Sequence, residues 1–293
     1  MSLNNRQSIL QHFAYLLQDF KIKDTLTSYN TFTDITNEYK PNDIFTIGKL
    51  DDTAIAVETS NNQIITVNEG KTKPIKKPDM PNVNISLSES KMSDLEQKLQ
   101  NDAQNLQTIE EIKSYLEKST FCDIKTLAKN TVLSDGAKNA DVMLIGEAPG
   151  EEEDENGIPF CGRSGRLLAN VLASIGLNRE TNLYITNTLF WRPPANRKPS
   201  KIEIEMCRPF VIRQIEIIKP KFLILCGAIA MESILMKDVK ISDMRGEILD
   251  SKIPNTSLKD IKVTAIYHPS YLLRNPIAKK IMWQDCIKIK GSL

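Results

Sequence analysis

The 293-residue sequence contains no apolar run of about 18 or more residues, the length that a helix needs to span a bilayer. An apolar stretch near its start, residues 9–20, is interrupted by Gln11, His12 and Gln18, and no small-residue cleavage site follows it. These absences predict a protein without a membrane span or a secretory leader. We therefore expect a cytoplasmic protein that does not contact membranes.

Paired cysteines are missing as well. The five cysteines are odd in number, scattered and without a C-x-x-C motif; they are Cys122, Cys161, Cys207, Cys226 and Cys286. This pattern argues against the disulfide framework of a small secreted domain and favours reduced thiols. Histidine is also scarce, because only His12 and His268 occur.

The net charge is small, at +1, but it is unevenly divided along the chain. Residues 136–293 carry 23 Lys and Arg against 18 Asp and Glu, which gives +5. Residues 1–135 carry 15 against 19, which gives −4. A modestly basic second half permits a polyanionic partner without requiring one.

The first hundred residues differ in composition from the rest. Apolar residues at helical spacing predict a short helix over residues 4–20, and the polar, Lys/Pro-rich stretch 21–84 is typical of a flexible linker. Two weakly alternating runs within residues 43–67 could pair as a hairpin, and Ser93 with Glu96 predicts the start of a polar helix. We expect residues 1–100 to form an N-terminal helix plus a partly disordered linker, and residues 101–293 to form the folded domain.

Within that domain, short apolar segments alternate with helical patterns. A helix is expected at 108–118, followed by strands at 142–146, 183–187, 222–226 and 261–267 and by helices at 164–175, from Ser200 onward, at 228–235 and at 278–289. Ser200 and Glu203 form a capping-box pattern, and Pro209 is expected to kink or restart that helix. The fold class is therefore α/β: a three-layer α/β/α sandwich around a central, mostly parallel four-stranded sheet.

The stretch DVMLIGEAPGEEEDENGIPFCGRSGRLL, residues 141–168, links the first of these strands to its helix through a loop. In open parallel sheets, ligands bind beyond the carboxyl ends of the strands. Four segments lie at those ends: residues 146–150, Asn187, Gly227 and His268. We expect them to converge on one pocket.

Five motifs occur in order along this half of the chain: GEAPGEEED, G-x-P-F-x-G-R-x-G-x-L-L, YITN, WRPPANR and HPSYLLR. The first alone is explained equally well as a tight turn. Together, in order and spacing, they resemble the family 4 uracil-DNA glycosylases over roughly residues 122–290. The resemblance implies an enzyme that flips uracil out of DNA and hydrolyses its N-glycosidic bond, leaving an abasic site that starts base-excision repair.

The resemblance also implies roles for individual residues. His268 would donate to uracil O2, in a protonation state that sequence leaves open. Asn187 would pair with uracil O4 and N3–H and so reject cytosine. Phe160 would stack on the flipped base, and Gly146 and Ala148 would supply backbone contacts.

Two carboxylates are candidates for a catalytic role because of their positions in the sequence. The acidic run 151–155 is by default a solvated loop face. Glu147 and Glu153 nevertheless match active-site positions of the family, where a carboxylate could orient the attacking water or stabilise positive charge on the sugar. We do not rank them. Ala148 stands where some related glycosylases carry an aspartate, so we expect the general-base contribution to be weak.

The segment from His268 to Arg274 resembles the DNA-insertion loop of the family. Leu272 or Leu273 would wedge into the gap left by the flipped nucleotide, although two leucines are more often simply buried. Candidate DNA contacts are Ser270, Arg274, Arg192, Arg197 and Lys198, with Lys279, Lys280, Arg163 and Arg166 as further cations.

The sequence departs from the family at the iron–sulfur positions. Many family 4 enzymes hold a [4Fe-4S] cluster on four cysteines; here Cys122 and Cys207 match two of them, whereas Ser119 and Trp191 stand at the others. Cluster ligation normally takes four thiolates. We therefore expect no cofactor and a branch of the family that lacks the cluster.

Two other readings remain open. One is a uracil-DNA binding protein that captures its substrate, even covalently, although the branch known for this carries Gln where Glu147 stands and has an added basic loop that is not visible here. The other is a non-catalytic replication or repair accessory module. In each case we expect a monomer that binds uracil-containing DNA, with residues 1–100 as the part that could bind a repair or replication protein.

Overall fold

The computed structural model describes residues 89–293 except 238, 252, 257 and 259–260. The expected helix at 4–20, the linker at 21–84 and the hairpin at 43–67 lie outside the described residues.

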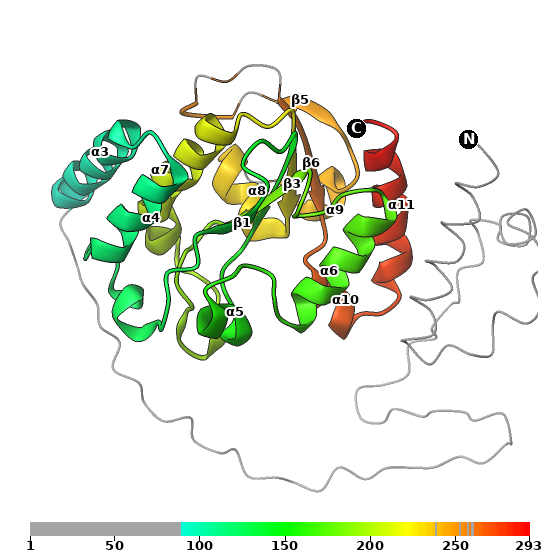
Figure 1. The fold of residues 1–293 in the computed structure, drawn as a ribbon, viewed down its shortest axis with the longest axis horizontal. Coiled ribbons are helices and arrows are strands. Elements are labelled where there is room, and N and C mark those ends of the chain that lie inside the picture. Colours follow the sequence, from blue (N-terminus) through cyan, green and yellow to red (C-terminus); the bar gives the residue numbers. More distant parts are fainter. Residues whose placement is uncertain (1–88, 238, 252, 257, 259–260) are drawn as a thin grey trace, which may run out of the picture. The chain divides into compact units, whose positions relative to one another are not determined.

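A six-stranded sheet forms the centre of the fold, in the order β1-β3-β2-β4-β6-β5 (Figure 1). Its four inner strands are mutually parallel: β2 (Val142–Gly146), β3 (Leu183–Asn187), β4 (Phe222–Cys226) and β6 (Ile261–Ile266). Because both faces of these strands are covered, their side chains are almost continuously apolar and buried. The four-stranded parallel core expected from the sequence is confirmed.

Two short antiparallel strands extend this core at its edges. β1 (Ser134–Gly136) pairs with β3, and β5 (Leu249–Ser251) pairs with β6. Neither was expected, because three residues are too few to show an alternating pattern.

Helices cover both faces of the sheet (Figure 1). One layer contains α7 (Lys201–Ile218) and α8 (Ala228–Leu235), with α3 (Glu89–Asn105) and α4 (Ile109–Lys118) packed outside α7. The other contains α6 (Arg163–Ser174), α10 (Pro269–Arg274) and α11 (Ala278–Lys290). Shorter segments are α5 (Glu151–Asn156), α9 (Ile241–Met244) and the 3-10 turns η1 (Asp123–Leu127) and η2 (Pro194–Asn196). The three-layer α/β/α architecture is confirmed.

Capping fixes where two of the helices begin. The Ser200 hydroxyl accepts the backbone N–H of Glu203, whose carboxylate accepts the N–H of Ser200, and Thr108 makes the equivalent box at α4. The helix that Ser200 opens continues through Pro209 to Ile218, so the expected restart at this proline is wrong. Its neighbours Arg208 and Phe210 are buried, with the Phe210 ring against Tyr115 and Phe121, and this packing holds the helix together where proline removes one backbone donor.

Three other local expectations need correction. Ser93 is not an N-cap, because α3 already begins at Glu89. This helix also crosses residue 100, the expected domain boundary, and packs against α7 as part of the folded body. The acidic run 151–155 is helical rather than a loop: α5 starts after Gly150 and ends at Gly157, whose φ of 69° is left-handed.

In the part of the chain that the structure describes, no helix combines the length and apolarity that crossing a membrane requires.

Candidate active site at the carboxyl ends of the strands

The carboxyl ends of the four parallel strands do meet. A Cβ atom added to Gly146, the last residue of β2, would lie 2.4 Å from Asn187 Oδ1 and 2.4 Å from Phe160 Cζ, so only glycine fits there. The rings of Phe160 and His268 lie 5.8 Å apart between centroids. Gly227, after β4, has φ of 100°, and a Cβ there would lie 3.2 Å from that of His268. One site thus receives residues from all four strands.

Asn187 is buried, with 1% of its surface exposed, at the end of β3. Its Oδ1 atom is inaccessible and accepts no hydrogen bond from any described residue. A buried acceptor without a partner costs about 1–3 kcal/mol, so it is retained in proteins chiefly where something else pairs with it. A ligand that donates a hydrogen bond beside Gly146 and Phe160 would supply the missing partner.

His268 caps the start of α10 through its own ring. Its Nδ1 accepts the backbone N–H of Ser270 at 3.2 Å and lies 2.8 Å from the Ser270 hydroxyl oxygen. Burial, with a smaller contribution from Arg274, lowers the pKa of His268 to about 4. At neutral pH the ring is therefore uncharged and carries its proton on Nε2, which leaves Nε2–H as a hydrogen-bond donor.

Glu147 follows Gly146 and is half-buried beside two cations. Burial raises the pKa of its carboxyl group, and the charges of Lys198 and Arg274 partly oppose this rise. Its backbone carbonyl accepts the Thr188 hydroxyl at 2.6 Å, which ties the turn after β2 to the turn after β3. The carboxylate itself is left available to act on a bound molecule.

Glu153, the other carboxylate that the sequence made a catalytic candidate, differs from Glu147 because its carboxylate oxygens already accept hydrogen bonds. Its Oε2 accepts the N–H of Gly150 at 3.1 Å, and its Oε1 accepts the N–H of Gly162 at 2.8 Å. Both oxygens are thus engaged in joining the turn after β2 to the start of α6. This geometry favours a structural role for Glu153 and leaves Glu147 as the carboxylate better placed for chemistry.

The insertion segment is helical rather than a loop. Within α10, Leu272 is buried, with 1% of its surface exposed, so its side chain is packed in the protein. Leu273 is half-buried and Tyr271 is 38% exposed. Of the two leucines considered as a wedge, only Leu273 is accessible. The hydroxyl oxygen of Ser270, a residue expected to contact DNA, lies 2.8 Å from Nδ1 of the His268 ring.

The cations expected to contact phosphates fall into two groups. Arg192 bonds Asn196 and Glu151, and Arg197 pairs with Glu203 of the capping box, so these two already have partners. Lys198 and Arg274 are exposed and form no ion pair with a described residue. These two flank the site at Glu147.

Three of the four residues at the family's cluster positions, Cys122, Cys207 and Trp191, are buried in the core, and Ser119 is half-buried. Cys207 is fully buried, which raises the pKa of its thiol, and the contact with Cys207 lowers the pKa of the neighbouring Cys122. Ser119 bonds the carbonyl of Leu116 at the end of α4. Trp191 is fully buried, donates to Thr131 at 3.0 Å and packs edge-on against an aromatic ring, that of Phe121.

This donor set does not fit an iron–sulfur cluster. Two thiols, a hydroxyl and an indole stand where four thiolates would be needed, and the indole fills its position with apolar side-chain volume. Among the described residues, no group of three or more His, Cys, Asp or Glu side chains could hold a metal ion.

The sequence did not reveal two residues that contact this site, Asp135 and Arg179. Arg179 donates to the backbone carbonyls of Pro159 and Phe160 and pairs with Asp135. Both lie outside the five motifs, and a lone charged residue in a loop or a short edge strand carries no local signal of such a contact.

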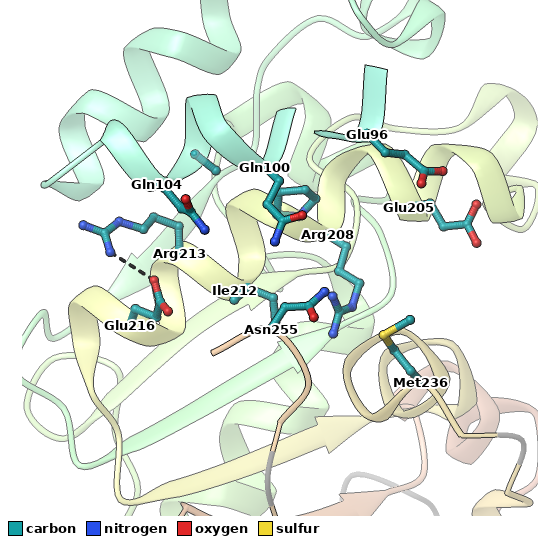
Figure 2. A pocket seen from close by; sticks show the side chains of 12 residues that line it. Glu96, Gln100, Gln104, Glu205, Arg208, Ile212, Arg213, Glu216, Met236 and Asn255 are labelled. Atoms are coloured by element: carbon teal, nitrogen blue, oxygen red, sulfur yellow. Dashed lines mark hydrogen bonds and ion pairs between the residues drawn. The ribbon is translucent and has the colours of Figure 1, made fainter. Parts of the chain in front are cut away.

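A cavity of about 180 Å³ lies elsewhere, between α3 and α7 (Figure 2). None of the candidate site residues lines it. Arg213 and Glu216 on its wall pair with each other at 3.0 Å, and Arg208 donates to the carbonyls of Ser233 and Pro254. The candidate site is therefore distinct from this cavity.

The fold and site together define a class: an α/β protein with a candidate binding site at the carboxyl edge of a parallel sheet. Comparison with known proteins makes this specific. A family profile described as Uracil DNA glycosylase superfamily matches residues 133–287. The chain belongs to this superfamily.

Several relatives match most of their length. The type-4 uracil-DNA glycosylase of Archaeoglobus fulgidus is 36% identical over 188 residues, covering 63% of this chain and 92% of that protein. The type-4 enzyme of Thermotoga maritima is 37% identical over 186 residues, covering 62% and 93%. That of Saccharolobus solfataricus is 38% identical over 183 residues, covering 61% and 83%.

Proposed function

We propose that this protein is a monofunctional uracil-DNA glycosylase that flips uracil out of DNA and hydrolyses its N-glycosidic bond. The product is an abasic site, which starts base-excision repair. Membership of the superfamily and the type-4 relatives support the activity. The observation that carries it to this site is the buried, unpartnered Oδ1 of Asn187 beside the Phe160 ring.

Base recognition follows from this arrangement. Asn187 Oδ1 accepts N3–H of uracil, and its Nδ2 donates to O4, while Phe160 stacks on the ring face. Cytosine has no proton at N3 and presents an amine at position 4, so it would meet two mismatched contacts. The backbone at Gly146 and Ala148 approaches the base edge, because no side chain intervenes at Gly146.

Bond cleavage places negative charge on uracil and positive charge on the sugar. His268, neutral and protonated at Nε2, donates to O2 as the C1′–N1 bond breaks and so stabilises the uracil anion. Water adds to C1′, and the proton it loses passes to solvent or to the departing base. Glu147 is the carboxylate that stabilises the sugar cation or orients this water.

The activity is tested with a labelled uracil-containing oligonucleotide, scored for abasic sites and for complexes that resist denaturation. We expect catalytic release of uracil that falls about 100- to 1,000-fold in His268→Ala and strongly in Asn187→Ala. A stoichiometric covalent complex would support capture instead. Binding without release or covalent attachment would support an accessory module.

We also propose that the enzyme works without an iron–sulfur cluster or another cofactor. The two cluster positions that lack cysteine, Ser119 and Trp191, have structural roles of their own, and Cys122 and Cys207 contact each other. Glycosidic hydrolysis needs only placed donors and water, so nothing in the reaction calls for a metal.

The remaining expectations concern the cellular setting. We propose a monomer in the cytoplasm, where the free thiols of the described residues stay reduced, and the residues before α3, 1–88, as a tether to another repair or replication protein. Deletion of residues 1–88 tests the tether. We expect unchanged uracil release with loss of partners in a pull-down, and unchanged partners would overturn it.

A further inference from the structure

Phe160 has a backbone conformation that aromatic residues rarely adopt. Its φ is 52°, in the left-handed region, where side chains other than glycine are disfavoured. Such a conformation persists only when its surroundings hold it, and it is found disproportionately at functional sites. The contacts that hold Phe160 therefore decide where its ring lies.

Two contacts fix the carbonyl group of Phe160. On one side is Gly165 in α6, where an added Cβ would lie 1.9 Å from the Phe160 oxygen. On the other side, the guanidinium group of Arg179 donates to this oxygen at 3.0 Å and to the Pro159 oxygen at 3.2 Å. The peptide units on both sides of the strained Cα atom are thus held by one side chain.

Arg179 is itself anchored. Its Nη1 lies 2.7 Å from Asp135 Oδ2, and the two side chains are 25% and 36% exposed. Asp135 is the middle residue of β1. This strand pairs with β3, which ends at Asn187. The edge strand thus connects the backbone of the stacking residue to the strand of the base-pairing residue.

We propose that Arg179, anchored by Asp135, is a positioning residue that sets the Phe160 ring for stacking on uracil. The inference rests on the function proposed above, because it requires Phe160 to contact the base. An arginine suits the task because its fork of donors reaches two carbonyls and a carboxylate at once, whereas a lysine offers one compact charge. The alternative is that Arg179 and Asp135 form a surface ion pair that contributes only to the stability of the fold.

A double-mutant cycle separates the two. Arg179→Ala is expected to lower kcat/KM for a uracil-containing oligonucleotide by about 100-fold, as displacement of a reacting group does. In a Phe160→Ala background the same substitution is expected to have little further effect, because Arg179 acts through that ring. Equal, additive losses in both backgrounds would overturn the proposal.

Arg213→Ala is the matched control. Arg213 also donates to a backbone carbonyl, that of Leu106, and pairs with a carboxylate, that of Glu216. It lies on α7, however, beside the cavity between α3 and α7. It is expected to leave kcat/KM unchanged. Arg179→Lys and Asp135→Asn, which perturb the fold less, are expected to show smaller losses in the same direction, and full activity in both would contradict the inference.

The outcome for the proposed function is read separately. If the wild-type protein releases no uracil, the function fails and the cycle has no starting point; thermal denaturation with free uracil then tests Phe160 alone. A wild-type enzyme that is active but shows additive losses retains its function and refutes only the role of Arg179.

Discussion

A single hydrogen bond decides how His268 can act. Because Nδ1 accepts the N–H of Ser270, the proton of the neutral ring is on Nε2, on the other side of the ring. The sequence located this histidine at the end of a strand but left its protonation open. Its capping contact and its burial answer that question together.

The depressed pKa of His268 has a consequence for stability. The unfolded chain takes up a proton near the ordinary pKa of 6.5, but the folded protein does so only near 4. Between these values the unfolded state binds more protons, so the free energy of unfolding falls as pH is lowered. We expect wild type to lose about 2 kcal/mol more than His268→Gln between pH 7 and pH 5.

Urea-induced unfolding of both proteins at the two pH values checks this. Groups other than His268 titrate in the same range, but they are common to the two proteins and cancel in the comparison. Parallel losses would show that the histidine is not held neutral by the fold.

Lys198 offers a second test at this scale. It is exposed, and its charge acts on Glu147 at the site. Lys198→Ala is expected to reduce the slope of log affinity against log salt concentration for duplex DNA by about 0.9, the loss of one phosphate contact. Arg197→Ala is the control, since Arg197 is already paired with Glu203 and is expected to change the slope less. Equal slopes for wild type and Lys198→Ala would remove Lys198 from the interface.

At the scale of elements, the sequence predicted what periodicity encodes. The apolar runs of β2, β3, β4 and β6 fixed the parallel core, and the rule that ligands bind at carboxyl ends placed Asn187 and His268 together. β1 and β5 were missed because their extended conformation depends on pairing with a neighbouring strand, which the local sequence does not show. α5 was missed because consecutive carboxylates indicate a solvated loop, and only the flanking Gly150 and Gly157 hint at a helix.

α5 also gives Glu153 a structural role. Its carboxylate joins Gly150 to Gly162, so it stabilises the turn that carries Glu147 and Ala148. Glu153→Gln keeps one acceptor but turns an amide N–H₂ toward a backbone donor. We expect the free energy of unfolding to fall by about 1–3 kcal/mol, together with a loss of activity.

Glu152→Gln is the neighbouring control, because Glu152 bonds Arg163 and Arg166 from an exposed position. Its effect on urea-induced unfolding is expected to be smaller. A Glu153→Gln protein with unchanged stability and a greatly reduced single-turnover rate would instead assign Glu153 to the chemistry.

For the molecule as a whole, Trp191 and the rings packed on it fill a position at which the family resemblance implies a cluster cysteine. Anaerobically purified protein is expected to contain no stoichiometric iron and no absorbance near roughly 400 nm. Trp191→Ala is expected to cost about 3–5 kcal/mol in urea-induced unfolding, because it leaves a large cavity. Four irons per chain, or a melting temperature that chelators lower, would show that a cluster is present.

β1 gives the molecule an unequal distribution of stability. This strand has three residues and one neighbour, whereas β2 and β4 are paired on both sides. Short elements at an edge fray at a lower free energy than the cooperative core. Since Asp135 lies in β1, we expect fraying of this strand to release Arg179, and with it the ring of Phe160, while the rest of the protein stays folded. On heating, we expect the enzyme to lose binding of the base before it unfolds. Hydrogen exchange at residues 134–136 would mark the temperature at which β1 frays.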